Sequence, residues 1–581
     1  MDSFKVILQF ETVFPEENYQ DYLGKLNEIP KELLIDFSTH FLRFENENPL
    51  NIDYKLLLFN WFNKENEGFV RHLIQVIDNY LKTNGREFII INPRTSLTLF
   101  EHILFQENSD KSEQNNSEHE ILLFKIYLAY NTHTIQSEKQ VAKSTEEIDS
   151  KFNFTAKILT QSLANYDISN FNLKSVFVSE FVKVLLFFKM VSQKKKFQPL
   201  IKKFYQYFDV LDYKEYIKKL APLCITTIES SSAGYIDINV SKNETYETNI
   251  RFIEKFSLSD TYEKGERDFI HLRNNPFIKI ENGKFRIIYP LFVVEKIYKS
   301  LYFIFNDLNN KLPDDDKIKH LRNEFTFEFS EKKLLYELLG KAYKNKYIKI
   351  TGEEMANEKI DGAIDYYIRN GNKIFIFESK DILINANVKA SYDYRLINNE
   401  LHKKLYFEPL EGGKTKNAAV CQLSNFIQLL LSESFPLDNK YKSKNAKIYP
   451  VIVLHNRQLE ISGLNKQVNE WFKTERSKLN ELGYDDSKIR DIVVLNIDSL
   501  IHYHELIQCK KFNLEDLIDD YLKSCDRERF LIKLKKEQLK NPWEQSNFQL
   551  VQHKSFSMYL FDRLGWHLTS LFEEEGLNIF N

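Results

Sequence analysis

The chain has 581 residues, of which 43% are hydrophobic and 28% are charged. This composition is typical of folded proteins and excludes a chain that is disordered throughout, while the length predicts three or more domains rather than one hydrophobic core. The formal net charge is −3, so the chain as a whole does not attract a polyanion, and a nucleic-acid partner would have to bind at local basic patches.

The sequence offers no support for membrane insertion or secretion. No stretch approaches the ~18 consecutive apolar residues that a membrane-spanning helix needs, and residues 1–18 lack the basic and apolar regions of a signal peptide. The four cysteines, at positions 224, 421, 509 and 525, are too scattered for a zinc site or a disulfide framework. We therefore expect a soluble, cytoplasmic protein in a reducing compartment.

The N-terminal part of the chain is predicted to be helical. Apolar residues recur at spacings of three and four through residues 1–105 and again from 121 to about 220. Residues 106–120 are polar and are predicted to form an exposed loop. We assign residues 1–224 to one or more helical domains.

The next stretch, residues 225–325, is predicted to be a small α+β segment followed by a linker. Strands are predicted at 235–240 and at 284–294, the second after a turn at Asn282-Gly283.

From residue 326 the pattern runs helix, strand, hairpin, helix, strand, helix, strand, helix, which predicts a central mixed sheet flanked by helices. Its last two strands are predicted at 447–455 and 491–500, and residues 382–416 are predicted to be a long connection. We assign 326–515 to this α/β domain and 516–581 to a helical C-terminal extension. The predicted fold class is therefore a multidomain chain with a mainly α N-terminal half.

The most informative stretch is DGAIDYYIRNGNKIFIFESKD, residues 361–381. It predicts two strands joined by a tight Asn-Gly-Asn turn, and the second strand is strongly apolar until it ends in Glu-Ser-Lys. Side chains two residues apart on a strand leave the same face, so Glu378 and Lys380 point to one side and Ser379 to the other. The turn would place Asp365, on the first strand, beside Glu378.

A pair of acids beside a lysine is a residue set that suits phosphodiester hydrolysis. The carboxylates of Asp365 and Glu378 are the hard oxygen ligands that Mg²⁺ (or Mn²⁺) prefers, and the carbonyl oxygen of Ser379 is available as a further ligand. Lys380 would orient the attacking water or ease its deprotonation, and would add positive charge in the transition state. The alternative is a surface hairpin that ends in an ordinary Glu–Lys pair.

Over about residues 326–510 these motifs resemble the PD-(D/E)xK superfamily of nucleases, which has the restriction-endonuclease-like fold. The resemblance implies that Asp365 and Glu378 bind the metal and that Lys380 assists the nucleophilic water. The proline of the family's name is absent, because Ile364 precedes the aspartate.

Three other residues are candidates for the same site. Asp361 competes for the role of the aspartate, but the glycine after it is more typical of a turn that enters the strand. Glu331 falls within the apolar stripe of a helix predicted at 329–343, where the family often places a glutamate near the metal. It could equally be a first-turn residue that stabilises the helix dipole behind an N-cap serine. Gln422, at the edge of the stripe of a helix predicted at 418–431, resembles the glutamine that some members place beside the metal; the alternative is a core-edge amide bonded to the backbone.

Lys414 and Lys416 lie in a glycine-containing part of the connection and could grip substrate phosphate, although a solvated loop is the alternative. The resemblance implies a metal-dependent nuclease that favours DNA over RNA. The resemblance also implies a place in bacterial defence against foreign DNA, where large architectures with a helical front end occur. Because dimers are common among relatives, it implies a homodimer or a defence-system partner protein. The alternative from another class is a non-catalytic scaffold whose nuclease-like domain binds nucleic acid or protein.

Overall fold

The structure is a computed structural model, and it describes residues 6–44, 53–84, 88–105, 117–169, 171–229, 234–259, 267–344, 346–507, 512–526, 532 and 549–580. The fold is mixed α/β, as predicted. The chain divides into two compact units: unit 1 comprises residues 1–140, 168–180 and 203–301, and unit 2 comprises residues 141–167, 181–202 and 302–581. The division into four consecutive domains stays a prediction. Among the described residues, no helix has the length and apolar character that crossing a membrane requires.

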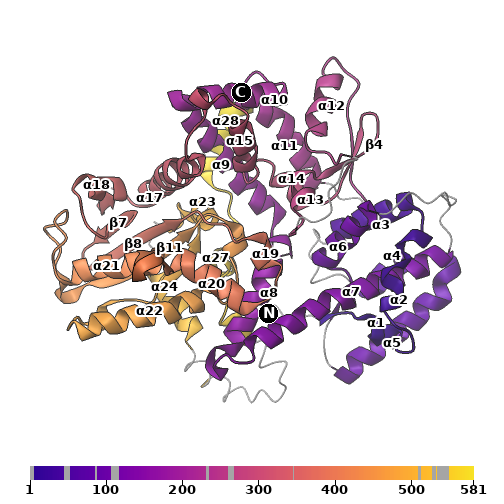
Figure 1. The fold of residues 1–581 in the computed structure, drawn as a ribbon, viewed down its shortest axis with the longest axis horizontal. Helices are drawn as coiled ribbons and strands as arrows, with labels where there is room; N and C mark the ends of the chain where they lie inside the picture. The colour runs from indigo at the N-terminus through magenta and orange to yellow at the C-terminus, as the bar shows by residue number, and fades with distance from the viewer. Residues whose placement is uncertain are drawn as a thin grey trace. The chain divides into compact units, whose positions relative to one another are not determined.

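Unit 1 is mainly helical (Figure 1). Its N-terminal helices enclose a core rich in aromatic side chains, in which the rings of Phe41 and Trp61 stack with centroids 4.2 Å apart. A parallel pair of strands and a three-stranded antiparallel sheet of order β3-β5-β4 complete the unit. The elements that lie wholly or partly in unit 1 are β1 (Val6–Ile7), α1 (Phe10–Val13), α2 (Gln20–Leu23), α3 (Lys31–Phe44), α4 (Tyr54–Trp61), α5 (Glu67–Asn84), β2 (Phe88–Ile89), α6 (Pro93–Leu104), α7 (Ser117–Thr145), α9 (Leu173–Gln193), α10 (Gln198–Phe208), α11 (Tyr213–Glu229), β3 (Asp237–Asn239), α12 (Tyr246–Glu254), α13 (Ile270–Asn274), β4 (Phe277–Glu281), β5 (Lys284–Ile287), α14 (Pro290–Val294) and α15 (Leu301–Asn310).

Two predictions for this part of the chain need correction. Residues 106–116 of the predicted loop lie outside the described residues, but α7 already begins at Ser117. Glu120 is buried in this helix, where it accepts hydrogen bonds from the N–H of Asn63 and the side chain of Asn66. The strand predicted at 284–294 is shorter, because β5 ends at Ile287 and Pro290 begins helix α14. At the first position of a helix the missing N–H of proline costs nothing, since that N–H would have no partner within the helix.

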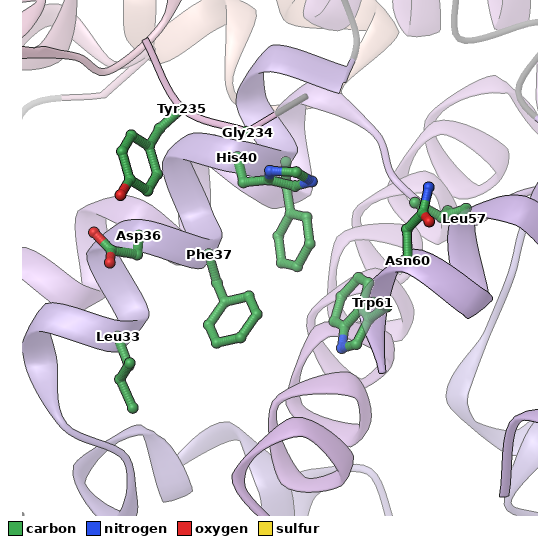
Figure 2. Close-up of a pocket in the computed structure, with 10 residues that line it drawn as sticks. Leu33, Asp36, Phe37, His40, Leu57, Asn60, Trp61, Gly234 and Tyr235 are labelled. Carbon is green, nitrogen blue, oxygen red and sulfur yellow. The ribbon is translucent and has the colours of Figure 1, made fainter. Parts of the chain in front are cut away.

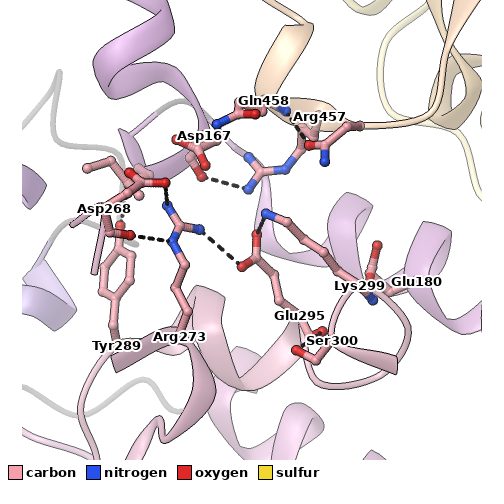
Figure 3. Close-up of polar contacts among 12 residues, drawn as sticks. Asp167, Glu180, Asp268, Arg273, Tyr289, Glu295, Lys299, Ser300, Arg457 and Gln458 are labelled. Atoms are coloured by element: carbon pink, nitrogen blue, oxygen red, sulfur yellow. Dashed lines mark hydrogen bonds and ion pairs between the residues drawn. The ribbon is translucent and has the colours of Figure 1, made fainter. Parts of the chain in front are cut away.

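A buried carboxylate in unit 1 is fully paired. Glu295 is 3% exposed and accepts from Lys299 at 2.6 Å and from Arg273 at 3.4 Å, and Arg273 also donates to the carbonyl oxygen of Asp268 at 3.0 Å (Figure 3). Such pairing is what allows charged groups to lie inside a protein.

Unit 2 is built on a five-stranded mixed sheet of order β12-β11-β8-β7-β6. Strands β6 (Ile348–Thr351), β7 (Tyr366–Asn370) and β8 (Lys373–Lys380) form an antiparallel meander, and β8, β11 (Lys447–Leu454) and β12 (Val493–Asn496) run parallel. The predicted hairpin is therefore present, and Gly371 supplies the positive φ of its turn.

Helices cover both faces of this sheet (Figure 1). The face that carries Ile374 and Ile376 packs against α20, α21, α22 and part of α8, and the ring of Phe375, on the opposite face, lies 6.0 Å from that of Tyr343 after α17. The remaining elements of unit 2 are α8 (Ser150–Ser169), α16 (Leu321–Asn323), a π-helix (Glu324–Leu335), α17 (Tyr336–Ala342), α18 (Gly352–Asn357), α19 (Ala386–Lys389), α20 (Tyr394–Leu405), β9 (Phe407–Pro409), β10 (Thr415–Asn417), α21 (Ala419–Leu431), α22 (Leu464–Glu481), α23 (Ile497–Tyr503), α24 (Leu514–Cys525), α27 (Phe556–Leu564) and α28 (Ser570–Phe580).

Three predictions for unit 2 are wrong in detail. The connection at 382–416 contains α19, α20 and the antiparallel pair β9–β10. The strand predicted at 491–500 ends at Asn496, whose side chain caps α23. The helix predicted at 329–343 begins at Glu324 and is a π-helix up to Leu335, so that the N–H of Tyr336 bonds to a carbonyl five residues back. Most of the C-terminal extension is helical where it is described, but residues 527–531 and 533–548 lie outside the described part.

A buried ion pair joins α8 to α19 within unit 2. The side chain of Lys389 is 0% exposed and donates to Asp167 at 2.7 Å, and the carbonyl oxygen of Asp167 accepts from Arg457 at 2.7 Å (Figure 3). Removing either partner would leave an uncompensated charge in the interior.

Candidate functional site

The hairpin places Asp365 opposite Glu378. The ladder pairs Tyr366 with Phe377, so one further step of the same register brings Asp365 and Glu378 face to face on one side of the sheet. Two hydrogen bonds to the residues before and after Glu378 hold Asp365 in place. Its N–H donates to the carbonyl oxygen of Phe377 at 3.2 Å, and its Oδ2 accepts from the N–H of Ser379 at 2.6 Å.

Lys380 lies on the same face as Glu378, as the alternation of the strand predicted. Its Nζ donates to Glu378 Oε1 at 2.5 Å. The side chain of Glu378 is 1% exposed and that of Lys380 is 20% exposed. The second oxygen of the glutamate, Oε2, is buried and has no hydrogen-bond partner among the described residues. The strand thus ends in a buried carboxylate with one oxygen paired and the other open.

Glu331 belongs to the same cluster, but not for the reason that the helix pattern suggested. It lies in the π-helix, half-buried, and accepts from the hydroxyl of Tyr336 at 2.6 Å. The alternative role in a first helical turn behind Ser330 is wrong, because Ser330 lies inside the helix and its hydroxyl donates to Asp381 at 2.7 Å.

These four side chains determine one another's charge. Burial, and then repulsion from Asp365, raise the pKa of Glu378 to about 8 and that of Glu331 to about 7. Burial also raises the pKa of Asp365, against the opposing effect of Lys380. Burial lowers the pKa of Lys380, but the surrounding carboxylates outweigh this effect and raise it overall. The lysine therefore stays protonated, and each of the two glutamates gains or loses a proton near neutral pH.

The donor set suits a hard divalent cation. The described residues include no group of three or more His, Cys, Asp or Glu side chains placed as metal ligands. Magnesium, however, is commonly held by one or two carboxylates and completes its shell with water and substrate phosphate. Asp365 and Glu378 supply such a pair, and the buried, unpaired Oε2 of Glu378 is an acceptor that a cation would satisfy. The two acids therefore fit Mg²⁺ or Mn²⁺ in oxygen type and in charge.

On the opposite face, Ser379 contacts His455, a residue that the sequence did not single out for the site. The hydroxyl of Ser379 lies 2.7 Å from Nε2 of His455, and the backbone N–H of His455 donates to the carbonyl oxygen of Lys380 at 3.3 Å. Burial lowers the pKa of His455 to about 4, so the ring is neutral. His455 follows β11, which runs parallel to β8, and the ends of parallel strands meet at one edge of a sheet. That rule could have pointed to this residue. The role of the Ser379 carbonyl as a ligand stays a prediction.

Gln422 lies in the first turn of α21. This helix covers the sheet face that carries Glu378, as the 6.2 Å separation of the Phe426 and Tyr367 rings shows. The Oε1 of Gln422 is buried and has no hydrogen-bond partner among the described residues, so the expected bond of this oxygen to the backbone is not present. Its amide makes no hydrogen bond to the carboxylate cluster within the described part of the chain.

The remaining candidates lie at the surface. Lys414 and Lys416 are exposed at the β9–β10 hairpin, in place of the predicted loop, and Asp361 is exposed in the turn before β7. None of the three forms a hydrogen bond or ion pair with the carboxylate cluster among the described residues. The structure therefore brings together Asp365, Glu378, Lys380 and Glu331.

No family model, no curated protein and no solved structure matches this chain. What the site does must be inferred from its own geometry.

Proposed function

We propose that the chain is a metal-dependent nuclease that hydrolyses phosphodiester bonds, with DNA favoured over RNA. The observation that carries this proposal is the pairing of Asp365 with Glu378 on one face of the sheet, with Lys380 bonded to the glutamate. The mixed sheet with helices on both faces is compatible with the restriction-endonuclease-like arrangement that the sequence resembles.

In this proposal Asp365 and Glu378 hold Mg²⁺ or Mn²⁺. The cation, when bound, neutralises charge on the phosphate and makes its water more acidic. Lys380 does not act as the base, because the carboxylates keep it protonated. It instead donates hydrogen bonds to the attacking water or to a phosphate oxygen and adds positive charge as the pentavalent centre forms.

Glu331 is the group best suited to accept the proton of the attacking water. Its pKa, raised to about 7, lies where a general base works best at neutral pH. The water oxygen would bond to phosphorus as its proton moves to Glu331, and the bond from phosphorus to the leaving sugar oxygen would break, with that oxygen taking a proton from solvent. The hydrogen bond from Tyr336 holds the carboxylate in place meanwhile.

The test is to incubate the purified full chain with plasmid, single-stranded DNA and RNA, with Mg²⁺, Mn²⁺ or a chelator. We expect degradation only with metal, and a loss of about 100-fold or more in Lys380→Ala, the usual effect of removing a group that stabilises the transition state. Lys373→Ala is the matched control, because this lysine lies at the other end of the same strand and pairs with Glu515 at 2.6 Å.

Two results would contradict the proposal. Full activity of Lys380→Ala would exclude the mechanism. Binding of nucleic acid without cleavage under every condition would instead favour the non-catalytic scaffold. A role in bacterial defence, with a homodimer or a defence-system partner, remains part of the proposal and rests on the sequence resemblance alone.

A further inference from the structure

One carboxylate ties the end of β8 to the π-helix. Asp381 follows Lys380, the last residue of β8. Its Oδ2 accepts from the hydroxyl of Ser330 at 2.7 Å, and its Oδ1 accepts from Nη2 of Arg322 at 2.7 Å. The same nitrogen of Arg322 also donates to the carbonyl oxygen of Asp381 at 2.7 Å. Both carboxylate oxygens are therefore bonded to donors from one helical segment, which runs from α16 into the π-helix.

The surroundings of this bridge make it firm. Ser330 is buried and the side chain of Asp381 is largely buried, so little water competes for their hydrogen bond. The guanidinium of Arg322 lies 4.8 Å from the ring centroid of Tyr302, a contact that limits its orientations. Hydrogen bonds in which one partner is charged are stronger than those between neutral groups. The bridge therefore fixes where the helical segment lies on the end of the strand.

The bridge is adjacent along the chain to two groups of the carboxylate cluster. Asp381 directly follows Lys380, and Ser330 directly precedes Glu331. Among the described residues, the hydrogen bond that the Glu331 carboxylate accepts comes from Tyr336, which belongs to the same helical segment. That bond cannot hold Glu331 against the strand. The bond between Asp381 and Ser330 does join the helical segment to the strand, one residue away from Glu331.

We propose that Asp381 is a positioning residue that fixes Glu331 relative to Lys380. It does so through its bonds to the helical segment, and it does not itself hold the cation, because both of its oxygens accept from protein donors. The inference rests on the proposed function, in which Glu331 takes the proton of the attacking water. A general base must lie within hydrogen-bond reach of the proton that it removes, and a misplacement of about 1 Å can cost about 100-fold in rate.

The test is cleavage by the full chain in Mg²⁺ of the substrate that the parent chain cuts, with kcat and KM measured separately. Asp381→Ala removes both bonds and should lower kcat about 10- to 100-fold while KM changes less than about 3-fold, because a displaced base slows the chemical step alone. Ser330→Ala removes only the bond beside Glu331 and should lower kcat about 10-fold.

Asp381→Asn is the conservative variant. Its amide oxygen can accept from Arg322, and its amide nitrogen can donate to the hydroxyl of Ser330, so both links to the helical segment are kept. We expect its kcat to stay within about 3-fold of that of the parent chain. A residue that acted through its charge would instead lose as much activity in the asparagine variant as in the alanine variant.

The same substitution in a Glu331→Gln chain shows whether the effect passes through Glu331. Once the base is absent, its position no longer matters. Asp381→Ala should therefore lower the residual kcat of Glu331→Gln by no more than about 2-fold, although the same change is worth about 10-fold or more in the parent chain. Single-turnover measurements with excess enzyme give these low rates.

Asp519→Ala is the matched control in unit 2. Asp519, on α24, also joins an arginine to a hydroxyl, because it accepts from Arg490 at 2.9 Å and from Tyr449 at 3.4 Å. It makes no hydrogen bond or ion pair with the carboxylate cluster within the described part of the chain. We expect its kcat to equal that of the parent chain.

Asp36→Ala is a second control, in unit 1. Asp36 pairs with Arg286, and together with Tyr235 it lines a cavity of about 300 Å³ (Figure 2). The variant thus removes a carboxylate from an arginine without changing unit 2. Its kcat should also equal that of the parent chain.

Several results would overturn the inference and leave the proposed function standing. They are a parental kcat in Asp381→Ala, a change confined to KM, an equal loss in Asp381→Asn, an undiminished loss in the Glu331→Gln chain, and an equal loss in Asp519→Ala. If the parent chain cleaves no nucleic acid under any condition, the proposed function fails and the inference fails with it.

Discussion

Replacing Glu378 by glutamine should stabilise the folded chain and abolish cleavage at the same time. Glu378 is 1% exposed and faces Asp365, so the folded state must either bury a repelled negative charge or bind a proton. Glutamine has nearly the same shape and can still accept from Lys380, but it carries no charge. Sites built for catalysis often reduce stability in this way.

The size of the effect follows from the pKa. Burial and Asp365 raise the pKa of Glu378 from 4.5 to about 8. A carboxyl group whose pKa is higher in the folded state than in the unfolded state stabilises the folded chain fully below pH 4.5. This stabilisation is lost as the pH rises towards 8. At pH 7, which is between these two pKa values, most of this stability is lost, an effect on the order of 3 kcal/mol. Glutamine removes this cost but also weakens the attraction to Lys380. We therefore expect the free energy of unfolding of the variant to exceed that of the parent chain by only about 1–2 kcal/mol, and its Tm to be higher by roughly 2 °C.

Thermal unfolding in the presence of a chelator measures this difference. We expect the gap in Tm between Glu378→Gln and the parent chain to be wider at pH 8 than at pH 5. Glu337→Gln on α17 is the control, because that glutamate is 27% exposed and pairs with Lys333 on the helix surface. Added Mg²⁺ should raise the Tm of the parent chain and not that of Glu378→Gln. A less stable glutamine variant, or a gap that does not change with pH, would refute the reasoning.

Three further predictions test other parts of unit 2. Gly352→Ala should lower cleavage about 10-fold or more in the plasmid assay, because the new Cβ would lie 2.9 Å from the carbonyl oxygen that precedes Asp365; unchanged cleavage would contradict this. Arg369→Leu should cost about 3–5 kcal/mol in urea unfolding, because Asp438, 1% exposed and paired with Arg369 at 2.5 Å, would keep a buried charge; a near-neutral effect would contradict it. Burial lowers the pKa of His553 to about 3, so stability should fall by up to about 5 kcal/mol as the pH drops from 6.5 towards 3, and His553→Gln should flatten this fall in thermal melts.

The parts of the site that the sequence predicted are those set by local pattern. A tight Asn-Gly-Asn turn between apolar runs fixes the register of the hairpin, and that register alone puts Asp365 opposite Glu378. Alternation along β8 then places Lys380 with the glutamate and Ser379 on the other face. The side chains concerned are at most fifteen residues apart, so no long-range packing had to be known.

The parts that could not be predicted depend on distant contacts. Nothing in the helical periodicity shows that residues 324–335 form a π-helix, which changes the position of Glu331. The contact of Ser379 with His455 spans 76 residues. The cavity in unit 1 joins Asp36 and Tyr235, about two hundred residues apart, and only the folded chain brings them together.

The chain passes between its two units five times. A gene fragment that begins at residue 302 would encode all five strands of the mixed sheet and the whole carboxylate cluster. It would lack the segment with Leu159 and Leu163, which fills the core beneath the sheet, and Asp167, the partner of Lys389. We therefore expect that this fragment of unit 2 cannot be expressed alone or exchanged as a module. During translation, α8 is synthesised long before the strands that it covers, so its apolar face stays unpacked until those strands have left the ribosome.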